Sequence, residues 1–140
     1  QYKRFRVKLM EEEKTALKLQ QIMQDLNSKN TLLIVEGKKD HDAVRRLGYT
    51  GAIFEMCGSG GGTKRLAEAI GKYKNIVILF DLDKRGKRLE KTIKSKIAYG
   101  GLTIDYTTRI KIKSIAGGIA HIEDLIKFAD YLTTAQDSSL

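Results

Sequence analysis

Thr31-Leu-Leu-Ile-Val-Glu-Gly-Lys-Lys-Asp40 combines a strand, a carboxylate and a helix start in one short stretch of this 140-residue chain. Its first five residues form an unbroken β-branched and apolar run, which is typical of a strand buried on both faces. Glu36 follows directly, Gly37 breaks the strand, and Asp40 can cap the helix that comes next. This order predicts a parallel α/β sheet, in which ligands bind at the carboxyl ends of the strands.

A second strand also ends in carboxylates. Ile76-Val-Ile-Leu-Phe80 is the strongest strand signal in the chain, and Asp81 and Asp83 follow it. If this strand and the one at 31–35 are neighbours, Glu36 can join the two aspartates as a third oxygen donor or as a base. Such donors suit Mg²⁺, which takes one or two protein carboxylates together with water and phosphate. The alternative interpretation is that these carboxylates only cap the helices that follow them.

The remaining segments complete an α/β pattern in a single domain. We expect further strands at 52–54, 102–106 and 110–112, a basic arm or short edge strand at 1–9, and helices at 11–28, 63–70, 84–97 and 122–132. Placing 31–35 beside 76–80 puts the strand at 52–54 on the outer side. The prediction is therefore a mainly parallel four-stranded sheet of order 2-1-3-4, flanked by helices, with an extra helix at the N-terminus.

The charge of the chain indicates a polyanionic partner. Lys and Arg number 26 against 17 Asp and Glu, which gives a net charge of +9 and a pI near 9.6. The excess lies in the first nine residues and in the segment 84–96, which points to nucleic acid. No apolar run is long enough to span a membrane. A single cysteine, Cys57, excludes an internal disulfide and a cysteine-based zinc module, so we expect a cytoplasmic protein.

The two strand-end motifs resemble the Toprim domain. Val35-Glu36-Gly37-Lys38-Lys39-Asp40 and, about 45 residues later, Asp81-Leu-Asp83-Lys84-Arg85-Gly86 carry this resemblance, which covers roughly residues 31–110. It is closest to the small stand-alone Toprim proteins and to ribonuclease M5. It implies a Toprim/Rossmann-like core at 31–110, preceded by the arm and helix of 1–30 and followed by a C-terminal helical element at 111–140.

The resemblance also implies roles for individual residues. Glu36 would act as general acid or base at a phosphodiester, and Asp81 and Asp83 would hold Mg²⁺, with Mn²⁺ as the alternative ion. Topoisomerases of this family often carry a third acidic residue at the position of Lys87, so we expect one bound ion rather than two. The chain has no Walker A motif, and it is too short for strand passage by a topoisomerase.

Basic residues near these motifs are candidate contacts to nucleic acid. We expect phosphates to lie against Lys38, Lys39, Lys84, Arg85, Lys87, Arg88 and Lys91. A charged helix face that is merely solvated is the alternative interpretation. The loop Gly58-Ser59-Gly60 is a weaker candidate for phosphate binding, since it lacks the spacing of a P-loop. His121 precedes Glu123 in a weak pattern that helix capping explains, although Glu123 could supply a third carboxylate.

Three functions remain open from the sequence. The first is Mg²⁺-dependent cleavage of phosphodiesters in nucleic acid, with structured RNA favoured over DNA. The second is a nucleic-acid-binding module that cleaves nothing, which Lys87 and the small size favour. The third, a distant alternative, is a haloacid-dehalogenase-type phosphatase that uses Asp81 and Asp83. That alternative leaves Glu36 unexplained, and Arg85 stands where that family usually has threonine or valine.

Overall fold

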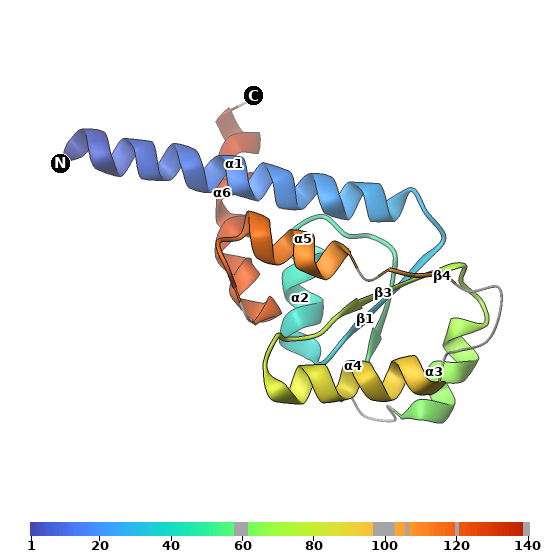
Figure 1. The fold of residues 1–140 in the computed structure, drawn as a ribbon. Coiled ribbons are helices and arrows are strands. Elements are labelled where there is room, and N and C mark those ends of the chain that lie inside the picture. The colour runs from blue at the N-terminus through green and yellow to red at the C-terminus, as the bar shows by residue number, and fades with distance from the viewer. Residues whose placement is uncertain (58–61, 97–102, 106, 120, 139–140) are drawn as a thin grey trace.

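A four-stranded parallel sheet forms the centre of the molecule (Figure 1). The computed structural model describes residues 1–57, 62–96, 103–105, 107–119 and 121–138. The strands are β1 (Thr31–Val35), β2 (Ala52–Glu55), β3 (Asn75–Leu79) and β4 (Thr103–Asp105). They pair in the order β2-β1-β3-β4, and each pair is parallel. The predicted strand order is confirmed.

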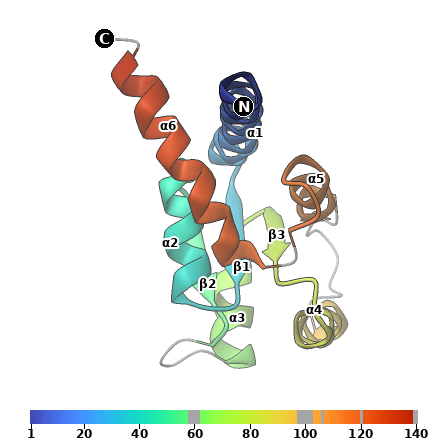
Figure 2. The same ribbon diagram turned by 90° about the vertical axis from the view of Figure 1, so that its left-hand side faces the viewer.

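Helices cover both faces of the sheet. They are α1 (Tyr2–Asn27), α2 (Lys38–Arg46), α3 (Thr63–Ile70), α4 (Lys84–Lys96), α5 (Thr108–Ile115), the 3₁₀ helix η1 (Ile122–Leu125) and α6 (Ile126–Ser138). Side chains of α3 and α4 pack on one face, and side chains of α1, α2, α5, η1 and α6 pack on the other (Figure 2). None of the described helices is both long enough and apolar enough to cross a membrane.

The apolar run of β1 supplies both cores. Successive side chains of a strand point to opposite faces of the sheet. Leu33 and Val35 accordingly belong to the core beneath α1, α2, α5 and α6. Leu32 and Ile34 belong to the core beneath α3 and α4. A strand buried on both faces is what the sequence predicts, and it fixes the direction in which Glu36 leaves the sheet.

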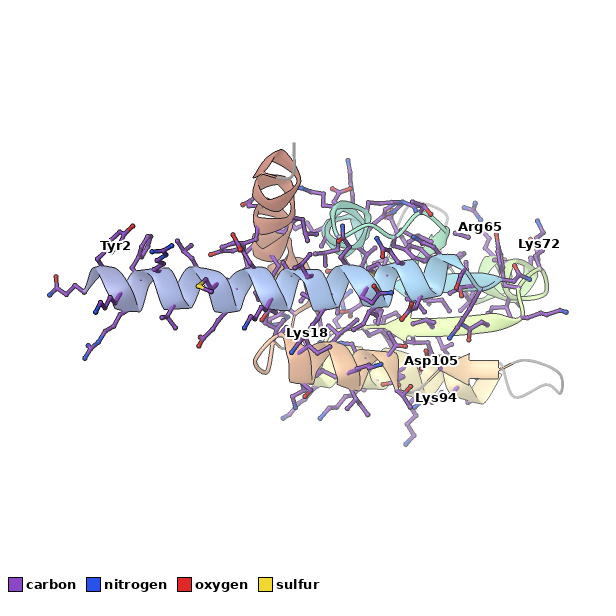
Figure 3. The ribbon with its side chains drawn as sticks, turned by 90° about the horizontal axis from the view of Figure 1, so that it is seen from above. Tyr2, Lys18, Arg65, Lys72, Lys94 and Asp105 are labelled. Carbon is purple, nitrogen blue, oxygen red and sulfur yellow. The ribbon has the colours of Figure 1, made fainter. Side chains whose placement is uncertain are left out.

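Residues 2–9 are helical, so the prediction of a basic arm or short edge strand at 1–9 is wrong. They form the start of α1, which runs without interruption to Asn27. The Lys and Arg residues of this segment and Leu9 are good helix formers, and neither Gly nor Pro interrupts α1. The later part of α1 is anchored to the core by buried side chains between Ala16 and Leu26. The earlier part projects beyond the sheet, where Tyr2 is 74% exposed (Figure 3).

The expected strand at 110–112 is part of helix α5. Arg109, Ile112 and Ala116 are buried at a spacing of three and four residues, whereas Ile110 is 66% exposed. That is a helical pattern, and the short apolar alternation at 110–112 does not reveal it. Asp105 also favours the helix, because its Oδ1 accepts the backbone N–H groups of Thr107 and Thr108 at 2.8 and 3.0 Å.

Candidate metal and nucleic-acid site

The ends of β1 and β3 bring Glu36 to Asp81. Val35 pairs with Leu79 in the parallel register, so both chains leave the sheet at the same edge. Glu36 Oε2 accepts a hydrogen bond from the backbone N–H of Asp81 at 3.1 Å. The adjacency on which the sequence-based metal site depends is therefore present.

The acidic side chains at this edge form two groups that share Asp81. One group contains Glu36, Asp40 and Asp81, and the other contains Asp81, Asp83 and His121. Within each group the potential ligand atoms lie within 4.8 Å of one another. Glu36 and Asp83, which the sequence assigns to one ion together with Asp81, thus fall into different groups.

Asp40 belongs to the site and is not the N-cap residue of α2, although the backbone of Gly37 hydrogen-bonds to its carboxylate. Gly37 is the N-cap residue, and Asp40 lies in the first turn, where it is only 6% exposed. The sequence offers one signal for this position: Asp40 follows Glu36 by four residues at the strand-to-helix turn, so the second carboxylate returns toward the strand end.

Asp83 lies at the start of α4. Its Oδ1 accepts the backbone N–H of Gly86 at 2.8 Å, so the capping interpretation describes part of its role. A carboxylate has about four lone-pair positions on its two oxygens, and it can cap a helix and contact an ion at once.

His121 reaches the site from the far end of the chain. Its Nδ1 lies 3.2 Å from Asp81 Oδ2, and the backbone N–H of Ile122 donates to Asp81 Oδ1 at 2.9 Å. The start of η1 therefore contacts both oxygens of Asp81. No spacing rule in the sequence could reveal this contact, because it depends on how the C-terminal helices return to the sheet.

The carboxylates shift one another's pKa values. Burial, together with repulsion from Asp81 and Asp83, raises the pKa of Glu36 to about 6. Burial and the charges of Asp81 and Glu123 raise the pKa of Asp40 to about 6. Burial would also raise the pKa of Asp81, but hydrogen bonds from Ile122 and His121 lower it below its ordinary value.

This donor set fits a divalent cation. Carboxylate oxygens are the ligands of hard cations, and a bound cation would offset the repulsion that raises the pKa of Glu36 and Asp40. The pocket they line has a volume of about 270 Å³. The acidic residues here could hold a divalent ion, and Glu123 also lines the pocket.

The predicted basic contacts fall into two groups. Lys38, Lys39 and Arg85 line the acidic pocket itself. Exposed side chains of α4 continue away from it, namely Lys84, Lys87, Arg88 and Lys91. The loop Gly58-Ser59-Gly60 lies outside the described residues. Cys57 is exposed, and its Sγ accepts a hydrogen bond from Arg85 at 3.3 Å.

A buried arginine, Arg109, hydrogen-bonds to the backbone just after β3. Arg109 of α5 donates from Nε to the carbonyl oxygen of Phe80 at 2.8 Å and from Nη2 to that of Ile119 at 3.3 Å. It therefore links the residue before Asp81 to the segment before His121. Sequence analysis missed Arg109, because the strand expected at 110–112 begins after it and gives no sign that residue 109 faces inward.

Comparisons with known proteins agree with this geometry. The sequence profile of the Toprim domain matches residues 31–116. The chain is 32% identical over 109 residues to a UPF0292 protein of Thermococcus sibiricus, covering 77% of this chain and 85% of that protein. It is 33% identical over 110 residues to a UPF0292 protein of Pyrococcus furiosus, covering 77% and 81%.

A solved structure shares the fold. A protein from Aquifex aeolicus superposes with a TM-score of 0.62 at 26% identity, covering 74% of this chain and 94% of that one. The profile match spans most of the chain, including Glu36, Asp81 and Asp83. By sequence, sheet order and acidic strand ends, this chain belongs to the Toprim family of metal-binding, nucleic-acid-related domains.

Proposed function

We propose that this chain is a Mg²⁺-dependent enzyme that cleaves phosphodiesters in nucleic acid, with structured RNA as its preferred substrate. The observation that carries the proposal is the contact of Glu36 with the strand end that presents Asp81. It places a candidate acid–base group beside the candidate ion ligands, in a pocket rimmed by basic residues.

The residues of the pocket have complementary roles in this proposal. A divalent ion, when bound, supplies charge neutralisation at a phosphate oxygen and lowers the pKa of a water molecule. Asp81 and Asp83 would hold it, with Mg²⁺ favoured and Mn²⁺ able to replace it. Glu36 would transfer the proton, and its burial, the largest cause of its raised pKa, supports that role.

The basic residues would bind the rest of the substrate. Lys38, Lys39 and Arg85 lie at the pocket and are suited to phosphates next to the scissile bond. The exposed lysines and arginines of α4 would bind phosphates further along the nucleic-acid strand. The preference for RNA rests on the resemblance to ribonuclease M5, and matched RNA and DNA hairpins would test it.

Cleavage of a labelled structured RNA in Mg²⁺ and in EDTA tests the enzyme directly. Asp81→Asn keeps the shape of the side chain but removes a charge that the ion needs, so cleavage should fall by at least about 10²-fold. Glu36→Gln should lower cleavage similarly while disturbing ion affinity less. Glu68→Gln, an exposed position on α3, is the matched control and should cleave like the wild type.

A non-catalytic binding module is the second candidate. Lys87 favours it, because it stands where topoisomerases of the family often carry a third acidic residue. Under this candidate the wild type cleaves nothing in Mg²⁺ or Mn²⁺, yet binds RNA as tightly as Asp81→Asn and Glu36→Gln. That result would refute the proposed enzyme.

A further inference from the structure

We infer that His121 is a ligand of the metal ion and raises the affinity of the site for Mn²⁺ relative to that of a site with oxygen ligands alone. The inference rests on the proposed metal site and adds to it a nitrogen donor from outside the Toprim match. That match ends at residue 116, so the family resemblance does not supply this residue.

The geometry of His121 is that of a donor at the open side of the site. Donor atoms of His121, Asp81 and Asp83 lie within 4.8 Å of one another, close enough to face a common ion. The imidazole is 47% exposed, whereas the side chain of Asp81 is 18% exposed. The imidazole is therefore the more solvent-exposed partner of this contact, and it is not packed in the core.

The backbone holds His121 in this place. The N–H of the next residue, Ile122, donates to Asp81 Oδ1, and the Ile122 side chain is fully buried. Arg109 also ties the carbonyls of Phe80 and Ile119 together, which joins the two segments that present Asp81 and His121. A ligand held in this way loses little freedom on binding an ion.

An imidazole changes which ion the site selects. Mg²⁺ takes oxygen ligands and gives up its water molecules reluctantly, whereas the first-row transition metals can also bind imidazole, Mn²⁺ the most weakly among them. A set of two carboxylates and one imidazole therefore favours Mn²⁺ relative to an all-oxygen set. It also offers a third ligand in a chain that carries Lys87 where related enzymes often place an acidic residue.

Pulsed EPR of the Mn²⁺-loaded protein tests the assignment on the wild type itself. A nitrogen bound directly to Mn²⁺ produces a characteristic modulation, and growth on ¹⁵N-histidine changes it only if that nitrogen belongs to histidine. We expect the histidine signal in the wild type and in His41→Gln, and we expect its loss in His121→Gln. His41 is the matched control because it is the other histidine of the chain and pairs with Glu55 at 2.7 Å.

Calorimetry supplies the second measurement. His121→Gln should bind Mn²⁺ at least about 10-fold more weakly, since even a residue that only supports a ligand is worth that much. Its Mg²⁺ affinity should change far less. Absence of the histidine signal in the wild type would overturn the role of His121 as a ligand. A loss of Mn²⁺ affinity in His121→Gln without that signal would reduce His121 to positioning Asp81. A wild type that binds neither ion would overturn the proposed metal site as well.

Discussion

Gly86 lies directly against the backbone of Asp81. A Cβ atom on Gly86 would overlap the carbonyl oxygen of Asp81 and would lie 2.8 Å from its carbonyl carbon. The Gly86 N–H donates at the same time to Asp83 Oδ1 at 2.8 Å. Gly86 lies in the first turn of α4, and the absence of a side chain there lets the helix start against the strand end that presents both aspartates.

Gly86→Ala should therefore disturb both the fold and the site. The methyl group meets backbone atoms, which cannot rotate away, so α4 or the Asp81 segment must shift. We expect a loss of about 1–3 kcal/mol in the free energy of unfolding. Mg²⁺ affinity should fall as well, because Asp81 and Asp83 move relative to each other. Urea denaturation and calorimetry measure the two effects.

Gly71→Ala is the matched control for that substitution. Gly71 ends α3 with a helical φ of −59°, and its added Cβ would meet the Glu68 carbonyl oxygen at an ordinary 3.8 Å. Stability should stay the same or rise slightly, because alanine restricts the unfolded chain. Equal stability of the Gly86 and Gly71 variants would show that the turn tolerates a side chain.

The sheet and its acidic edge follow from local signals. β1 and β3 are short apolar runs, each followed at once by carboxylates, and a parallel sheet places such ends at one edge. The neighbour relation of β1 and β3 could be inferred because it brings Glu36 to Asp81. Sequence alone predicts these features because each depends on a strand and the two or three residues after it.

The features that were missed depend on packing between distant segments. His121 contacts Asp81 only because η1 returns to the sheet edge. Arg109 faces inward only because residues 108–115 form helix α5. The helical structure of residues 2–9 was also missed, because the positive charge of the first nine residues is typical of a basic arm. Helical propensity determines the structure of residues 2–9, since their side chains are exposed and do not depend on the core.

Asp40→Asn should stabilise the ion-free protein at neutral pH. The pKa of Asp40 is about 6 in the folded protein, against an ordinary 3.8. Between these values the folded state binds more protons than the unfolded state, so wild-type stability falls as pH rises. Asparagine removes this effect. The stability of Asp40→Asn relative to the wild type should therefore rise by up to about 3 kcal/mol between pH 4 and pH 7.

Denaturation in EDTA across this pH range measures the difference. Asp42→Asn is the matched control, since Asp42 is an exposed carboxylate on the same helix, and it should not reproduce the rise. Saturating Mg²⁺ should reduce the advantage of Asp40→Asn, because an ion in the pocket stabilises the buried charge of the wild type. If the stability difference between Asp40→Asn and the wild type does not change with pH, burial does not raise the pKa of Asp40.

Replacing Lys87 and Lys91 by alanine should weaken the salt dependence of RNA binding. The two side chains are exposed one turn apart on α4, which starts at the acidic pocket. Each phosphate contact on a single strand contributes about 0.7 to the slope of log affinity against log salt, so the slope should become shallower by up to about 1.4.

The matched control is Lys18→Ala with Lys29→Ala, which removes the same charge at α1 and the turn after it. This double variant should leave the slope nearly unchanged, because α1 covers the opposite face of the sheet from α4. Equal slopes for both double variants would show that the lysines of α4 are merely solvated, since a general effect of net charge does not distinguish the two faces.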